Sequence, residues 1–222
     1  AADKDLTISG NDALRTLSDL SGLTSVPGAL IIFSNDTLTL LGLAGLTTAP
    51  DVTVTGNGHL PECFVDDLAE PAGVTVVDNS DNYDDYEAAG ECPRCDDDGT
   101  TRQMMVALPG ELLVTEVFSN PESSPDTGKE WVELKNIGAY DLDLNYLTIQ
   151  NTNGGTTTYT HNIDSSECVR LTAGDYGVIG GENALEIGLS IDVGVTGLEF
   201  LNSDGTGELS VDILRDGNSI DT

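Results

Sequence analysis

Basic residues are scarce in this sequence, which has 8 Lys and Arg against 39 Asp and Glu and a formal net charge of −31 at pH 7. A surface of this charge repels the phosphates of nucleic acids and the headgroups of anionic lipids. Long apolar runs are lacking as well, and none approaches the roughly 20 residues that span a bilayer. The composition therefore argues against nucleic acid as a partner and against direct insertion into a membrane.

Histidine is almost absent, with His59 and His161 as the two imidazoles of the chain. Hydrolysis by a nucleophile needs a base beside that nucleophile and a third group that orients the base, and neither histidine lies in a Ser or Cys motif. Phosphate-binding loops are missing too, since Gly154-Gly155 and Gly180-Gly181 are not followed by Lys. The sequence predicts a protein that is not an enzyme, has no catalytic residue and requires no cofactor.

Cysteine is limited to four residues, and these lie in turn-rich sequence beside Pro and Gly without His nearby. This setting favours disulfides over a metal site and indicates an oxidising compartment. The N-terminal Ala1-Ala2-Asp3-Lys4 has no hydrophobic signal region, so we expect any signal or anchor to have been removed or to lie outside the sequence. Regular apolar patterns in a chain that is 38% hydrophobic predict folding, and the length suits two domains.

The N-terminal part of the chain contains a repeat. Four short runs rich in β-branched residues begin 24, 22 and 22 residues apart, and they are Leu6–Ser9, Leu30–Phe33, Val52–Thr55 and Val74–Val77. Spaced leucines lie between the runs. Repeats of this length, with a strand and spaced leucines, are typical of solenoids, in which each coil buries its apolar side against the next. We expect the four runs to form one parallel sheet.

An asparagine follows each run at the same phase, and these residues are Asn11, Asn35, Asn57 and Asn79. At a turn, an Asn side chain can bond the backbone of its own coil and of the adjacent coil. We therefore predict a structural ladder of asparagines. Asn35-Asp36-Thr37 also matches a glycosylation sequon, but the ladder would hide Asn35.

The repeat over residues 6–26 resembles the repeats of receptor L-domain-like and leucine-rich bacterial surface proteins. The resemblance covers residues 5–92 and implies a short right-handed parallel β-solenoid, which we place at residues 1–95. In that family the last coil often begins Leu-Pro-x-Cys, and a second Cys follows an Asn-rich strand. Cys63 and Cys92 match these positions, so the resemblance implies a Cys63–Cys92 disulfide that closes the solenoid. The stretch Phe64–Ala69 between them predicts one or two helical turns.

The stretch from Asp78 to Thr101 is rich in Asp, Asn, Gly and Pro, which is the composition of a domain junction. We place an acidic linker at residues 96–110. Asp78, Ser80, Asn82 and Asp84 alternate in the manner of hard-cation ligands, which makes Asp78 and Asp84 candidate calcium ligands. The competing interpretation is a solvated linker, because the Gly and the final Glu of a helix-loop-helix calcium site are missing.

Residues 111–222 contain short strands in which apolar and polar side chains alternate, separated by turn signals such as Asp204-Gly205. Six or seven such strands in a segment of this length are typical of an antiparallel sandwich. The expected strands are Leu112–Val117, Trp131–Leu134, Leu147–Ile149, Thr157–Thr160, Val178–Ile179, Leu198–Leu201 and Leu209–Leu214.

The order of motifs in this half resembles the lamin-tail domain. The motifs are Leu113–Val117, Asn120-Pro121, Glu130–Asn136, Leu142–Ile149, Leu171–Ile179 and Asp216–Asp221. The resemblance implies an immunoglobulin-like antiparallel β-sandwich. The last strand stops at Thr222, earlier than in the family, and a short last strand leaves a neighbouring edge able to accept a strand from another chain. The competing interpretation is a C-terminus that is disordered or cut.

The pairing of the remaining cysteines has two alternatives. We expect Cys95 to pair with Cys168, which would tie the linker to the sandwich, alongside Cys63–Cys92. The alternative is Cys63–Cys95 with Cys92–Cys168, because four cysteines allow three connectivities.

Two glutamates, Glu116 and Glu133, lie in strands of the lamin-tail-like motifs and could meet as paired carboxylates. Together with Asp126 and Glu130 they are candidate ligands of one calcium ion. The competing interpretation is that all four are structural surface carboxylates. Trp131, the sole Trp of the chain, is interpreted as a core residue and not as a ligand-stacking one.

These features predict a structural or adhesive protein that binds protein or glycan surfaces. The resemblances imply secretion to the cell surface of a Gram-negative bacterium. One alternative is an accessory binding region of a larger secreted hydrolase, since lamin-tail-like domains often accompany such enzymes. Another alternative is a subunit of an extracellular filament or sheath that assembles through sheet edges.

Overall fold

A computed structural model of the chain describes residues 4–69, 71, 73–78, 94–97, 100–119, 128–153, 157–165, 168–183, 192–200, 209–215 and 218–220. Over these residues the fold is mainly β, with several sheets and one short α-helix. The chain divides into two compact units, Ala1–Met105 and Val106–Thr222. Each unit has fully buried apolar side chains and therefore a core of its own.

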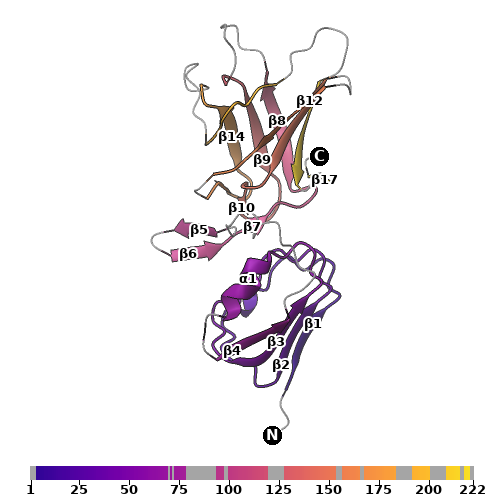
Figure 1. Ribbon diagram of the computed structural model, residues 1–222, viewed down its shortest axis with the longest axis vertical. Helices are drawn as coiled ribbons and strands as arrows, with labels where there is room; N and C mark the ends of the chain where they lie inside the picture. The colour runs from indigo at the N-terminus through magenta and orange to yellow at the C-terminus, as the bar shows by residue number, and fades with distance from the viewer. Residues whose placement is uncertain are drawn as a thin grey trace. The chain divides into compact units, whose positions relative to one another are not determined.

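The first unit contains a parallel sheet in the order β1-β2-β3-β4 (Figure 1). Its strands are β1 (Leu6–Ser9), β2 (Ala29–Phe33), β3 (Ala49–Thr55) and β4 (Val74–Asp78). Leu6 pairs with Leu30, and Leu30 pairs with Val52, so the register of the sheet follows the sequence repeat. The pairing shifts between β3 and β4. The four predicted strands are present, and each pairs with the next one along the chain.

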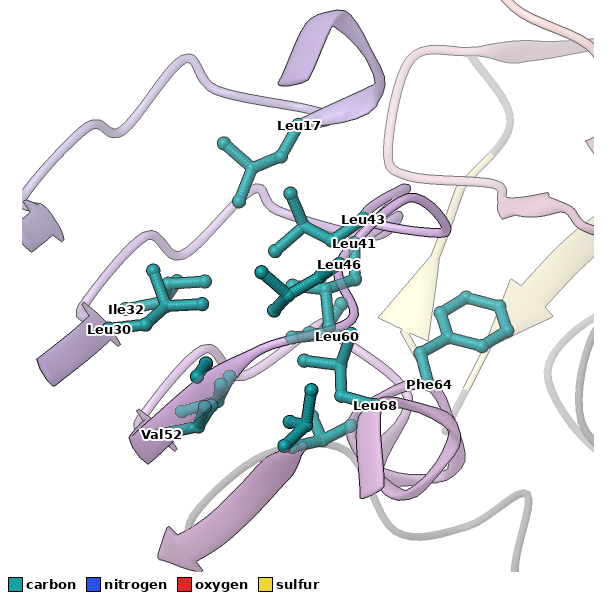
Figure 2. Close-up of a cluster of buried hydrophobic side chains, with 14 of the residues drawn as sticks. Leu17, Leu30, Ile32, Leu41, Leu43, Leu46, Val52, Leu60, Phe64 and Leu68 are labelled. Carbon is teal, nitrogen blue, oxygen red and sulfur yellow. The ribbon is translucent and has the colours of Figure 1, made fainter. Parts of the chain in front are cut away.

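The core of the first unit lies behind this sheet and is drawn in Figure 2. Inward-facing strand residues meet leucines from the segments between the strands, and the helical turns η1 (Ser18–Leu20), α1 (Glu62–Asp66) and η2 (Asp67–Ala69) complete the unit. Members that are 0% exposed are Leu30, Ile32, Leu38, Leu41, Ala49, Val52, Val54, Leu60, Phe64 and Val65. The spaced leucines of the repeat are therefore residues that fill the space behind the sheet.

The second unit contains two four-stranded sheets. One has the order β15-β14-β9-β8, formed by β8 (Leu112–Phe118), β9 (Trp131–Asn136), β14 (Tyr176–Gly181) and β15 (Val193–Val195). The other has the order β12-β11-β16-β17, formed by β11 (Thr148–Asn153), β12 (Thr157–Asn162), β16 (Leu209–Arg215) and β17 (Asn218–Ser219). A smaller sheet has the order β13-β10-β7, with β7 (Met105–Val106), β10 (Leu142–Asp143) and β13 (Arg170–Leu171).

The second unit differs from the predicted all-antiparallel arrangement in two places. β15 pairs in parallel with β14, so that sheet is mixed. The predicted strand at Leu198–Leu201 is wrong over its described residues, because Leu198–Phe200 is not a strand. Leu198 and Phe200 are buried, which explains the alternating pattern, but the Phe200 N–H donates to the carboxylate of Glu130 instead of to a neighbouring strand.

The segment predicted as a linker, residues 96–110, also differs from the prediction. It contains parts of β5 (Arg94–Asp97), β6 (Thr100–Gln103) and β7, and Met104–Leu108 is buried. The Gln103 side chain accepts the N–H of Gly42 at 3.3 Å and donates to Asp67 at 3.1 Å. The first unit extends to Met105, so the boundary between the units falls inside this segment and within its buried apolar run. The Asp-rich composition before Gln103 had pointed to a loop.

The second unit carries a pH-sensitive ion pair between Asp141 and Arg170. Burial by itself raises the pKa of Asp141, but the Ala173 amide, at 3.0 Å, and the Arg170 guanidinium outweigh it and hold the pKa below its ordinary value of 3.8.

We expect this pair to stabilise the unit by at most about 1 kcal/mol, because both side chains are partly exposed. A lowered folded-state pKa gives stability that is present above the unfolded pKa and is lost as the pH falls through the folded pKa. Urea unfolding of wild type and Asp141→Asn from pH 6 down to pH 2.5 tests this. The difference in the free energy of unfolding between the two proteins should become smaller as the pH falls. A difference that stays constant with pH would contradict a stabilising role of the ion pair.

Candidate interaction surface

Asn11, Asn35 and Asn57 form a hydrogen-bonded column along the first unit. The backbone and side-chain N–H groups of Asn11 donate to Oδ1 of Asn35 at 3.2 and 3.0 Å, and those of Asn35 donate to Oδ1 of Asn57, both at 3.1 Å. The Asn35 amide also donates to the carbonyls of Ile8 and Phe33, both at 3.1 Å. The amides of Asn35 and Asn57 thus tie their own strands to the preceding strand, through the carbonyls of Ile8 and Ile32.

The column is hidden from solvent, since Asn35 and Asn57 are both 0% exposed. Asn35 cannot serve as a glycosylation site in this fold, because its amide nitrogen is engaged and buried. The fourth predicted member, Asn79, lies outside the described residues.

The residue before each asparagine has a left-handed backbone. Gly10, Ser34 and Gly56 have φ of 64°, 52° and 61°. Glycine adopts this conformation without steric cost, and Ser34 is the member of the series that carries a side chain. This turn directs the following asparagine inward and ends the strand, so β1, β2 and β3 end at the paired residues Ser9, Phe33 and Thr55.

The outer face of β1, β2 and β3 presents two rows of uncharged side chains. The residues are Thr7, Ile31 and Thr53 in one row and Ser9, Phe33 and Thr55 in the next, and we call them the neutral face. Alternate residues of each strand point into the core, which leaves these six on the solvent side. Neighbouring strands lie about 4.8 Å apart and the two rows about 7 Å apart, so the six side chains form a regular array.

Phe33 is the most exposed apolar member of this array, at 40%. It lies in the central strand of the three, with Ser9 and Thr55 as its row neighbours. In a chain with 39 acidic residues, these two rows of hydroxyl, aliphatic and aromatic side chains are a local exception. Charge returns in the next row, where the exposed Asp51 of β3 lies beside Ala29 of β2. The six side chains of the neutral face can offer apolar contact and hydroxyl hydrogen bonds, and none of them is charged.

The predicted calcium ligands do not converge in the part of the chain that the structure describes. Glu116 and Glu133 are directly opposed on β8 and β9, but Glu133 accepts the Thr115 hydroxyl at 2.6 Å. Glu130 is buried, and its carboxylate accepts the N–H of Phe200. No group of three or more acidic, His or Cys side chains among the described residues could hold a metal ion.

The other candidate ligands cannot be placed. Asp84 and Asp126 lie outside the described residues, and Asp78 ends β4 with its side chain outside them. Trp131 is partly buried on β9 and stacks on Phe118, with ring centroids 5.7 Å apart.

Two of the cysteines, Cys63 and Cys168, are disulfide-bonded. Cys63 lies in α1, and Cys168 lies just before β13. Cys92 and the side chain of Cys95 lie outside the described residues. The pairing Cys63–Cys92 with Cys95–Cys168 stays a prediction.

Both histidines contact backbone carbonyls. His59 Nδ1 lies 2.5 Å from the oxygen of Asp36, and His161 Nε2 lies 3.1 Å from the oxygen of Glu199. Neither contact involves a Ser or Cys side chain. That the protein is not an enzyme stays a prediction from the sequence. None of the helices among the described residues is both long and apolar enough to cross a membrane.

The sequence-based reasoning missed the neutral face as a unit, although its signal was present. The outward positions of Leu6–Ser9, Leu30–Phe33 and Val52–Thr55 can be read from the alternation once the strands are aligned. Reasoning from charge concentrated on where carboxylates cluster and overlooked where they are absent. A scan of the chain against models of protein families finds no match, and no curated protein is similar to it in sequence.

Proposed function

We propose that this chain is a non-enzymatic, secreted structural or adhesive protein that binds protein or glycan surfaces through the neutral face. The observation that supports this proposal most is the array of Thr7, Ser9, Ile31, Phe33, Thr53 and Thr55 on a chain of net charge −31. Charge elsewhere keeps the protein soluble and discourages unspecific contact with anionic surfaces. The neutral face is the place where close contact costs least in charge repulsion and desolvation.

The finer fold assignment belongs to the same proposal. The first unit is a short right-handed solenoid of the receptor L-domain-like kind, supported by strand pairing at the 24- and 22-residue spacing of the repeat and by the asparagine column. The second unit is an immunoglobulin-like sandwich similar to lamin-tail domains, supported by two four-stranded sheets whose inward side chains are buried. Both folds are rigid scaffolds whose exposed faces can bind other molecules. Disulfide-bonded cysteines are consistent with location at a bacterial cell surface.

The chemistry of the neutral face selects its ligand class. An exposed aromatic ring flanked by hydroxyl groups can pack against an apolar patch, or against the C–H face of a sugar, while the hydroxyls bond to the rim. Without a positive charge, the face offers no ion pair to an anionic ligand. Neutral polysaccharides and uncharged protein patches are therefore the expected ligands.

Phe33→Asp tests this role. Loss of a central aromatic contact costs about 2 kcal/mol or more, so the dissociation constant should rise at least roughly 30-fold. Binding of the purified chain is measured on immobilised neutral polysaccharides and on purified cell-surface proteins. Ile137→Asp is the matched control, because Ile137 is 46% exposed and lies in the other unit.

The control variant is expected to bind as wild type does, and circular dichroism should show that both variants are folded. A wild-type chain that binds none of the surfaces would contradict the proposal. So would a folded Phe33→Asp variant that binds with unchanged affinity.

A further inference from the structure

The strand β12 forms one border of the sheet β12-β11-β16-β17 (Figure 1). Its described pairing is with β11 alone, from Thr148 opposite Asn162 to Asn153 opposite Thr157. The side chains of Thr158, Tyr159, Thr160 and Asn162 are exposed. A border strand directs every second N–H and C=O away from its sheet, so β12 offers a row of backbone groups to another strand.

Three features that usually protect border strands are missing from this edge, and its described contact with another segment is that of the His161 side chain with the Glu199 backbone. Charged side chains, Pro and bulges discourage pairing with a foreign strand. The sequence from Leu144 to Ile163, which includes β11 and β12, has no Asp, Glu, Lys, Arg or Pro and is the longest uncharged stretch of a chain that is 21% charged. The register between β11 and β12 runs without a shift over the whole strand.

The edge is also stiff and regular. Threonine and tyrosine favour extended strands, and β12 has the sequence Thr-Thr-Tyr-Thr-His-Asn. Cross-strand contacts hold its side chains at both ends, since Thr148 donates to Asn162 at 3.0 Å and the hydroxyls of Thr152 and Thr158 lie 3.3 Å apart. A strand that is already ordered loses little conformational entropy when it pairs again.

We infer that β12 pairs antiparallel with the β12 strand of a second copy of this chain, which joins the two sheets into one continuous sheet. Antiparallel pairing of identical strands satisfies a two-fold axis, the commonest symmetry of soluble oligomers. Charge favours this edge for contact between copies, because two chains of net charge −31 repel each other where carboxylates are exposed and β12 carries none. Two polyanionic copies can approach along this edge, because the β12 side chains of both copies are uncharged.

This inference is separate from the binding role of the neutral face. The two surfaces lie in different units, and they are measured differently, one by ligand affinity and the other by mass. Failure of Phe33→Asp to reduce ligand binding would leave the pairing of β12 untouched, and the reverse also holds.

Sedimentation velocity across a sodium chloride series is the first test. At low ionic strength, repulsion between copies of charge −31 should keep the protein at its monomer mass of 23.2 kDa. At about 1 M salt the screening length falls to about 3 Å, and the weight-average mass should rise toward twice that value. A monomer at every salt and protein concentration would overturn the inference.

Charge substitution at Thr160 is the second test. Thr160→Lys and Thr160→Glu each place like charges against one another across the two-fold axis, so each variant should stay monomeric at high salt. An equimolar mixture of the two should recover the dimer, because the charges are then opposite. Thr172→Glu adds the same charge at an exposed threonine after β13 and should dimerise as wild type does. Dimers of either Thr160 variant alone, or a mixture that stays monomeric, would overturn the inference.

Discussion

Replacing Asn35 by alanine is expected to lower the free energy of unfolding of the first unit by about 3 kcal/mol. The substitution removes the donors to the carbonyls of Ile8 and Phe33 and the acceptor for two N–H groups of Asn11. A buried polar group left without its partner costs about 1 to 3 kcal/mol, and Asn35 is 0% exposed. Domains have about 5 to 15 kcal/mol of stability in total, so this loss is a large share.

Thermal unfolding followed by far-ultraviolet circular dichroism measures the effect. A loss of about 3 kcal/mol corresponds to a fall of roughly 10 to 20 °C in Tm for a unit of this size. Asn11→Ala is the graded control, because Asn11 occupies the exposed end of the same column and should cost about 1 kcal/mol or less. Equal effects at the two positions would show that burial of the column does not determine its contribution.

Trp131 fluorescence distinguishes the unfolding of the second unit from that of the first in this experiment. It is the sole Trp of the chain and lies on β9 of the second unit, so its fluorescence follows the unfolding of that unit. The fluorescence transition should stay in place in Asn35→Ala while the circular dichroism transition moves. A fluorescence transition that moves equally would mean that the units unfold together.

The asparagine column was predictable from sequence because repetition reveals it. A single Asn indicates little, but Asn11, Asn35 and Asn57 recur at the spacing of the strands. A buried amide that joins neighbouring strand ends is the physical reason for such a recurrence. The strands of the first unit were predictable for the same reason. Each strand pairs with the strand of the next repeat, so local propensity and tertiary packing favour the same structure.

In the second unit the predictions were less complete, because its contacts do not repeat. Phe200 and Leu198 show the alternation of a strand, yet Phe200 bonds the side chain of Glu130, which is distant in the sequence. β15 has three residues, too few for a recognisable pattern, and it pairs in parallel. Glu130 was a candidate cation ligand because carboxylates are usually exposed, and its burial depends on packing that no local pattern reports.

Asn136 is the second unit's counterpart of Asn35, and its replacement by alanine is also expected to cost about 3 kcal/mol. It ends β9, is 0% exposed and donates to the carbonyls of Tyr140 and Leu171 at 2.8 and 3.0 Å. Its Oδ1 accepts the N–H of Gly138 at 2.9 Å. One amide therefore holds the turn after β9 and joins it to β13.

Trp131 fluorescence is the direct measurement for this variant, because Trp131 and Asn136 share β9. The fluorescence transition should move to lower temperature or lower urea concentration, while the first unit keeps its circular dichroism transition. Asn162→Ala is the control, since Asn162 is exposed on β12 and its loss should cost about 0.5 kcal/mol or less. A similar effect at both positions would contradict a special role for the buried amide.

Asn136→Asp distinguishes the lost hydrogen bonds from a simple loss of volume. The aspartate has the same size, but as an anion it has no N–H to donate and places negative oxygen against two carbonyl oxygens. Burial and those carbonyls raise the pKa of the introduced carboxyl in the folded state. The variant should therefore be most stable below the unfolded pKa of the group and lose stability as the pH rises through the folded pKa, the reverse of Asp141. If Asn136→Asp matched wild type at neutral pH, the two donated hydrogen bonds would not be what holds the turn.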